Sequence, residues 1–163
     1  MRNDMGSDMQ IILWRHAEAE DDAPSDMARK LTNKGQKQAG KMAAWLKAQV
    51  GNDIKHWRVI ASPAVRAQQT AEALQRPFET VDEIAPDASA DAVLRSAHWP
   101  RGSHNVIVVG HQPTLGMVAA YLINGVEGYV PVKKGAMWWF EVREHDGNSK
   151  SVLKAMATPD TIA

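Results

Sequence analysis

The stretch Gln10-Ile11-Ile12-Leu13-Trp14-Arg15-His16 runs from an apolar segment directly into two basic side chains. The segment Gln10–Trp14 is short, apolar and rich in β-branched residues, which is typical of a strand buried inside a sheet. Arg15 and His16 end this pattern abruptly. We therefore expect a buried strand with an arginine and a histidine at its carboxyl end.

The rest of the chain alternates strand-like and helical segments. Apolar runs predict further strands at Trp57–Ala61, Phe78–Val81, Asn105–Gly110, Ala136–Val142 and Ser151–Ala157. Caps and apolar spacing predict helices from the cap Thr32 to Gly51, from Ser62-Pro63, over Asp87–Ala97 and from Pro113. This alternation predicts a three-layer α/β/α fold with a mostly parallel central sheet. The last two strands, joined by the turn Asp146-Gly147-Asn148, are expected to form an antiparallel edge.

The composition is that of a globular protein of one domain. The chain has 163 residues, of which 44% are hydrophobic, and we expect a single domain over residues 9–163 after a frayed tail, residues 1–8. Lys plus Arg equals Asp plus Glu at 19 each, so the basic footprint of a nucleic-acid-binding protein is missing. The sequence contains no cysteine, which excludes thiol catalysis and disulfides.

The sequence also lacks the signals of membrane insertion and export. No apolar run is long enough to span a bilayer, and the first residues lack the hydrophobic core of a signal peptide. We therefore expect a cytoplasmic protein.

Polar side chains of unusual type follow three of the expected strands. Arg15 and His16 follow the first, Ser62 and Arg66 follow the second, and His111 follows Asn105–Gly110. Ligands of open α/β sheets bind at the carboxyl ends of the strands, and helix N-termini at that edge favour anions. We therefore expect two histidines and two arginines to converge on one anionic site without a metal.

This set of side chains suits phosphoryl transfer through a histidine. A neutral imidazole nitrogen is a competent nucleophile toward phosphorus, provided that a hydrogen bond to the other ring nitrogen sets the tautomer. Arginines supply planar, bidentate donors to the charged phosphoryl oxygens and can replace Mg²⁺ as the source of positive charge.

Four segments, in this order along the chain, resemble the motifs of the histidine phosphatase superfamily, also called phosphoglycerate mutase-like. They are Leu13–Ala19 (LWRHAEA), Arg29–Gly35 (RKLTNKG), Ser62–Ala71 (SPAVRAQQTA) and Val109–Pro113 (VGHQP). Within the superfamily the chain most resembles the short SixA-type phosphohistidine phosphatases. Only 44 residues lie between Arg66 and His111, so a phosphoglycerate mutase-like fold without a large lid subdomain is implied.

The resemblance also implies the role of each site residue. His16 would be the nucleophile, and Arg15, Arg66 and His111 would bind the phosphoryl oxygens. Glu83 is the best-placed general acid or base, with Glu18 and Asp87 as alternatives. No cofactor and no metal are expected.

The expected activity is a metal-independent phosphatase that removes the phosphoryl group from phosphohistidine in a protein, such as a phosphorelay domain. Its partner would be that phosphohistidine-bearing protein, and neither nucleic acid nor a membrane is expected to bind. We expect a monomer. Two alternatives remain open: a small-molecule phosphomonoesterase of the same superfamily, and a phospho-ligand binding module without turnover.

Overall fold

The computed structural model of the chain describes residues 8–145 and 147–162. Six strands form one sheet in the order β3-β2-β4-β1-β5-β6. Their bounds are β1 (Gln10–Arg15), β2 (Arg58–Ala61), β3 (Glu79–Thr80), β4 (Val106–Gly110), β5 (Met137–His145) and β6 (Asn148–Ala157). The first four strands pair in parallel, whereas β5 is antiparallel to β1 and β6 is antiparallel to β5. The expected parallel sheet with an antiparallel edge is thus confirmed.

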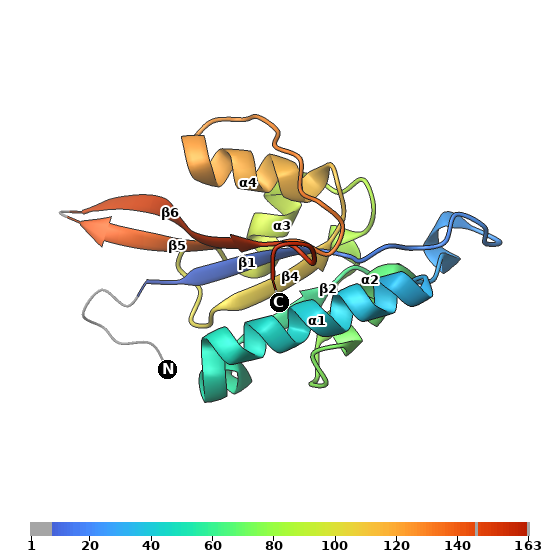
Figure 1. Cartoon of the computed structure of the whole chain (residues 1–163). Helices are drawn as coiled ribbons and strands as arrows, with labels where there is room; N and C mark the ends of the chain where they lie inside the picture. The colour runs from blue at the N-terminus through green and yellow to red at the C-terminus, as the bar shows by residue number, and fades with distance from the viewer. Residues whose placement is uncertain (1–7, 146, 163) are drawn as a thin grey trace.

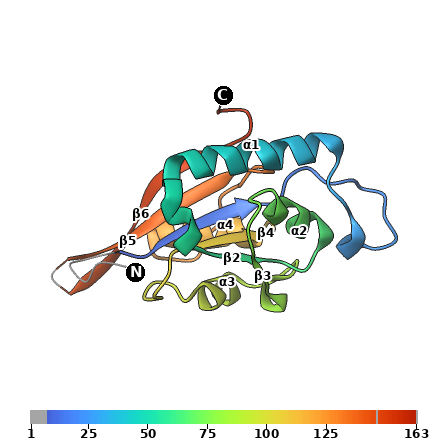
Figure 2. The same cartoon turned by 90° about the horizontal axis from the view of Figure 1, so that it is seen from below.

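Helices cover both faces of this sheet, which confirms the three-layer arrangement (Figures 1 and 2). One face carries α1 (Asn33–Val50) and α2 (Val65–Glu72), and the other carries α3 (Ala90–Ala97) and α4 (Thr114–Asn124). Between α2 and β4 the chain forms only β3, the short 3-10 helix η3 (Asp82–Ile84) and α3, so it has no large lid there. Two further 3-10 helices are η1 (Asp26–Ala28) and η2 (Gly51–His56).

The strand β1 is buried on both faces and links the two halves of the core. Ile12 and Trp14 pack into the cluster under α1 and α2, whereas Ile11 and Leu13 pack into the cluster under α3 and α4. All four side chains are fully buried. Because alternate residues of a strand point to opposite faces, one apolar run serves both layers.

The ends of α1 follow the local signals expected from the sequence. The hydroxyl of Thr32 accepts a hydrogen bond from the Gly35 N–H at 2.9 Å, which satisfies one of the free donors of the first turn. Gly51 ends the helix with a φ of 69°, a conformation that glycine adopts without steric cost.

Two expected helix starts are wrong. The helix α2 begins at Val65 after Ala64 and has no side-chain cap, since the Ser62 hydroxyl accepts from the Ala64 N–H, one residue before the helix, and also contacts His111. The helix α3 begins at Ala90 and is capped by Ser89, since Asp87 has a φ of 70° that helical geometry does not allow.

The closing hairpin is longer than expected and projects from the sheet (Figure 1). The expected turn falls at its tip, where Gly147 has a φ of 82°, but Asp146 lies outside the described residues. Residues 1–7 of the expected tail also lie outside them, so that expectation stays a prediction. No helix in the described part of the chain is long and apolar enough to cross a bilayer.

We predict that Gly35→Ala destabilises the fold by about 1–3 kcal/mol, the usual cost of overpacking. A Cβ at Gly35 would lie 2.0 Å from the Glu18 carbonyl oxygen, so α1 and the loop after β1 could not keep their contact. The matched control is Gly40→Ala on the same helix, where a Cβ meets nothing within 4 Å. At this position alanine should stabilise the folded protein by about 0.5–1 kcal/mol. Urea unfolding measures both; equal stabilisation would contradict the close packing at Gly35.

Candidate active site

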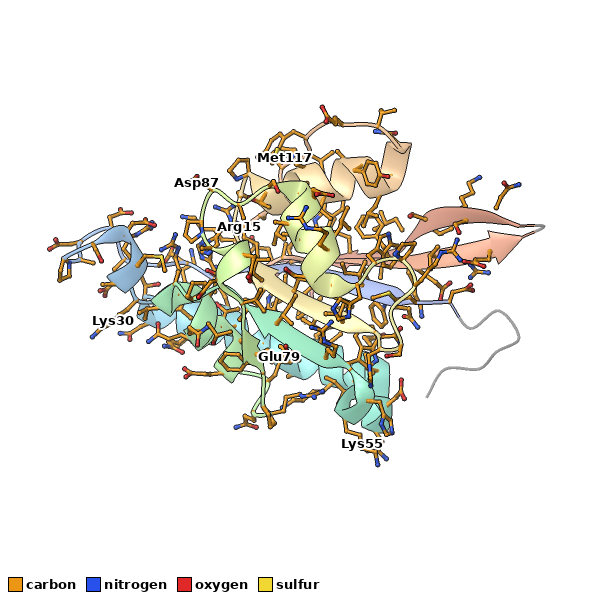
Figure 3. The ribbon with its side chains drawn as sticks, turned by 180° about the vertical axis from the view of Figure 1, so that it is seen from behind. Arg15, Lys30, Lys55, Glu79, Asp87 and Met117 are labelled. Atoms are coloured by element: carbon orange, nitrogen blue, oxygen red, sulfur yellow. The ribbon has the colours of Figure 1, made fainter. Side chains whose placement is uncertain are left out.

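Three strand ends bring the predicted side chains together at one edge of the sheet. The register pairs Arg15 with Gly110, and the His16 N–H donates to the Gly110 carbonyl at 3.1 Å. His16 and His111 therefore lie side by side, with ring centroids 5.2 Å apart. Figure 3 shows Arg15 at this end of the molecule and Lys55 toward the other.

The ring of His16 is held in one tautomer. Its Nδ1 atom lies 2.8 Å from the Ala17 carbonyl oxygen, which can only accept, so Nδ1 carries the proton. The Nε2 atom is then unprotonated, and its lone pair accepts a hydrogen bond from the Arg66 Nε–H at 3.3 Å. The side chain thus presents an unprotonated nitrogen next to a guanidinium.

Burial keeps His16 neutral. The residue is only 6% exposed, and burial, together with the charges of Arg66 and Arg15, lowers its pKa to about 4. The bond to Ala17 opposes this effect without reversing it. At neutral pH the ring is therefore uncharged, as a nucleophile must be.

His111 is oriented by a serine that the sequence suggested only as a helix cap. Its Nε2 atom lies 2.7 Å from the Ser62 hydroxyl, which also accepts from the Ala64 N–H. The serine proton is then available to His111 Nε2, which leaves the ring proton on Nδ1. That Nδ1 atom is buried and has no partner among the described residues. Burial and the neighbouring His16 lower the pKa of His111 to about 3.

The two arginines supply the positive charge of the site. Arg15 donates through Nη1 to the Val132 carbonyl at 2.8 Å, while its buried Nε has no partner among the described residues. Burial lowers the pKa of Arg15. Arg66 is 4% exposed, so its guanidinium is fixed in place beside His16. Donors held in this way need little reorganisation when an anion binds.

Asp26 also belongs to the site, although the sequence analysis did not select it. Its carbonyl accepts from Arg66 Nη1 at 2.7 Å, and its carboxylate accepts from Arg66 Nη2 at 3.1 Å. Burial raises the pKa of Asp26, but hydrogen bonds from Arg29 and Arg66 outweigh it and hold the pKa below its usual value. The aspartate charge also partly offsets the lowering of the pKa of His111.

The loop that carries Asp26 is tied to α2. The Thr70 hydroxyl accepts from the Ala17 N–H at 3.1 Å, and the Gln69 side chain accepts from the Leu31 N–H at 2.7 Å. In Figure 1 this loop extends beyond the sheet at the end where β1 stops. The same helix therefore positions Arg66 and the loop that contacts it.

The three carboxylates considered as acid or base are not held at His16. Glu83 lies on η3, is exposed, and makes no hydrogen bond or ion pair with the residues that the structure describes. Glu18 accepts from the Thr32 hydroxyl at 2.7 Å and so fastens the start of α1. Asp87 is exposed in the turn before α3. The identity of the acid or base therefore stays a prediction.

No group of three or more potential metal-binding side chains occurs in residues 8–145 and 147–162. The arrangement instead brings a neutral imidazole, two fixed guanidiniums and a second histidine to one end of the sheet. Together these can hold a tetrahedral oxyanion and attack its central atom.

Several known proteins are similar to this chain in sequence and in fold. The family model of the histidine phosphatase superfamily (branch 1) matches residues 11–89. The chain is 32% identical to the phosphohistidine phosphatase SixA homolog of Haemophilus influenzae, over 93% of this chain and 97% of that protein. It is 34% identical to phosphohistidine phosphatase SixA of Escherichia coli, over 72% of this chain and 76% of that protein.

A solved structure of the protein histidine phosphatase SixA complexed with tungstate has the same fold. It matches with a TM-score of 0.77 and 28% identity, over 93% of this chain and 98% of that one. The resemblance expected from the sequence motifs is thereby confirmed. The chain belongs to branch 1 of the histidine phosphatase superfamily, among the homologues of SixA.

Proposed function

We propose that this protein is a metal-independent phosphatase that removes the phosphoryl group from phosphohistidine in a protein, through a covalent phosphohistidine on His16. The observation that carries the proposal is the unprotonated Nε2 atom of a neutral His16, which accepts from the Arg66 guanidinium. The relatives named phosphohistidine phosphatase support the same substrate class.

In the first step, His16 Nε2 attacks the phosphorus of the bound substrate. The new N–P bond forms as the P–N bond to the substrate imidazole breaks, and that imidazole leaves with the electron pair and takes up a proton from solvent water. Arg15, Arg66 and the Nδ1–H of His111 hold the phosphoryl oxygens during the transfer. The Ala17 carbonyl stabilises the positive ring of His16 that results, because it accepts from Nδ1.

In the second step, water attacks the phosphorus, and the P–N bond to His16 breaks. Inorganic phosphate leaves, and the ring returns to its neutral tautomer with the proton on Nδ1. The burial that depresses the pKa of His16 favours this return, since it disfavours a charged imidazole.

The carboxylates near the site favour a phosphohistidine substrate over an ester. Asp26 contacts Arg66 and Arg29, which keep it ionised, so it cannot serve as a proton donor at neutral pH. Glu83 is exposed and unattached within the described residues. An imidazole leaving group departs more readily than an alkoxide, so P–N cleavage tolerates a weak acid where ester cleavage does not.

A small-molecule phosphomonoesterase is the second candidate, because the same four side chains would serve it. The unprotonated Nε2 atom of His16 can act as a nucleophile, which disfavours a binding module without turnover. We expect a phosphohistidine-bearing protein to exceed phosphomonoesters in kcat/KM. An ester that is turned over faster and with a low KM would favour the second candidate.

We predict that His16→Ala lowers turnover by about 10³-fold or more, the scale for removal of a nucleophile. Acid-labile, alkali-stable phosphate should be trapped on the wild type and be absent from the variant. The matched control is His104→Ala, which removes an exposed histidine and should leave labelling intact. Equal labelling of the wild type and His16→Ala would exclude the covalent mechanism.

We predict that Asp26→Asn strengthens inhibition by inorganic phosphate about 3- to 10-fold, because one negative charge a few ångströms from the anion is removed. Asparagine can still accept from Arg66, so the guanidinium stays in place. The control is Asp21→Asn in the same loop, whose exposed carboxylate lies 3.6 Å from Arg29. Weaker phosphate binding in Asp26→Asn would show that the carboxylate charge is needed to position Arg66.

We predict that the folded state loses stability as the pH falls from about 6.5 to about 4. In the unfolded chain His16 and His111 take up protons near pH 6.5, but in the folded protein their pKa values are about 4 and about 3. Each contributes a slope of about 1.4 kcal/mol per pH unit in this window. Urea unfolding of the wild type and of a His16→Gln/His111→Gln variant measures the difference. Equal slopes would contradict the depressed pKa values.

A further inference from the structure

A furrow between α3 and α4 adjoins the site and plays no part in the chemistry described above. Two cavities, of about 760 and about 540 Å³, share Asp91, Leu94 and Tyr121 and so form one continuous groove. We call it the α3–α4 groove. Its site-proximal part adds Ser89, Met117 and Glu127, and its distal part reaches Trp99 and the β5–β6 hairpin.

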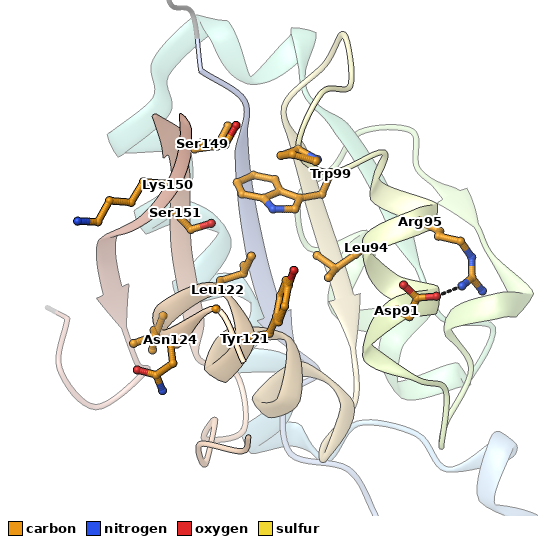
Figure 4. A pocket seen from close by; sticks show the side chains of 14 residues that line it. Asp91, Leu94, Arg95, Trp99, Tyr121, Leu122, Asn124, Ser149, Lys150 and Ser151 are labelled. Carbon is orange, nitrogen blue, oxygen red and sulfur yellow. Dashed lines mark hydrogen bonds and ion pairs between the residues drawn. The ribbon is translucent and has the colours of Figure 1, made fainter. Parts of the chain in front are cut away.

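The α3–α4 groove has an apolar floor and a polar rim. In Figure 4 the side chains of Leu94, Trp99 and Tyr121 face one hollow, with Ser149 and Ser151 of the hairpin on its other side. Four of the eight exposed large apolar side chains in the described residues lie between residues 121 and 129: Tyr121, Ile123, Val126 and Tyr129. Of these, Tyr121 and Ile123 line the groove, and exposed apolar side chains beside a groove favour a contact surface.

The groove is continuous with the active site through the loop after α4. Gly128 lines the groove, and the next residue, Tyr129, accepts a hydrogen bond from Gln112 at 3.0 Å. Gln112 directly follows His111. The same loop reaches Arg15, which donates to the Val132 carbonyl. A protein whose phosphohistidine reaches His16 must therefore lie against the surface where the groove begins.

The charges of the groove indicate the chemistry of its occupant. The charged residues of its site-proximal part are Asp91 and Glu127. The distal part adds Arg95 and Lys150, but Arg95 pairs with Asp91 and the Lys150 side chain points away from the hollow (Figure 4). Glu127, which makes no ion pair with any described residue, is therefore the charge that a docked segment meets near the site. A segment with apolar side chains next to a lysine or arginine complements this surface.

We propose that the α3–α4 groove docks an apolar segment, flanked by lysine or arginine, of the same protein that presents the phosphohistidine. This inference rests on the proposed function. The groove provides the contacts beyond the phosphoryl group, so it determines which phosphohistidine proteins are used. It contributes to KM for the protein and leaves the chemical step to the site.

The test compares two substrates with the same scissile bond: free phosphohistidine, and a histidine phosphotransfer domain phosphorylated with phosphoramidate. In the Tyr121→Ala/Glu127→Lys variant, kcat/KM for the domain should fall about 10-fold or more because KM rises. Turnover of free phosphohistidine should change less than about 2-fold, which also reports an intact fold. The matched control is Leu153→Ala on β6, since Leu153 is 43% exposed and Tyr121 is 44% exposed.

Binding gives a readout without turnover. In a His16→Ala background, calorimetric titration with the phosphorylated domain should show a Kd that rises about 10-fold when the two groove substitutions are added. Three results would each contradict docking in the α3–α4 groove. The first is an unchanged kcat/KM and Kd for the domain in the groove variant. The others are an equal loss of kcat/KM on both substrates, and an equal loss of kcat/KM for the domain in Leu153→Ala.

Two other outcomes distinguish a failure of the proposed function from a failure of substrate docking in the groove. A wild-type protein that hydrolyses free phosphohistidine or esters but no phosphohistidine protein would overturn the proposed function, and the groove with it. A wild-type dimer in sedimentation that Tyr121→Ala/Glu127→Lys dissociates would identify the occupant as a second copy of this chain and overturn the docking of substrate.

Discussion

The pairing of β1 with β4 is the constraint on which the rest of the site depends. Because the strands are parallel and in register, Arg15 lies beside Gly110, and the two histidines that follow must emerge as neighbours. The burial of β1 on both faces prevents a slip of this register, since a shift by one residue would exchange the contents of the two cores. The packing of β1 in the two cores therefore holds the register that places the ring centroids of His16 and His111 5.2 Å apart.

The sequence predicted those features whose causes are local. Thr32 and Gly51 mark the ends of α1 by the geometry of capping and of positive φ, and both were identified correctly. The apolar run Gln10–Trp14 was identified because burial on both faces leaves no room for polar residues. The convergence of Arg66 and His111 followed from the order of strands and helices rather than from any single spacing.

What could not be predicted depends on contacts between distant segments. Ser62 has the local signature of a helix cap, yet its hydroxyl contacts His111, 49 residues away. Asp26 stands in a polar loop that resembles any solvated turn, and only the fold brings it to Arg66. Neither residue has a periodicity or a spacing that the sequence could reveal. Such partners orient or neutralise a site and are visible only once the chain is folded.

The site balances burial against charge. Depressed pKa values keep both histidines neutral, and this requires positive neighbours and little water. The same arginines would repel each other and protonated groups without a counter-charge, which Asp26 provides at the outer nitrogens of Arg66. An arriving phosphoryl group brings its own negative charge and competes for those nitrogens. The aspartate thus neutralises the Arg66 guanidinium, and it occupies the nitrogens that an anion would contact.

This balance explains how the site works without a large lid. A lid excludes water at the moment of reaction, which strengthens the electrostatic contacts inside. Here His16 is 6% exposed and Arg66 4% exposed before any substrate binds, so most of that exclusion is built into the packing of β1 and α2. A site whose histidine and arginine are already buried by the fold suits the phosphohistidine protein proposed above, because such a protein would cover the rest of the site when it docks.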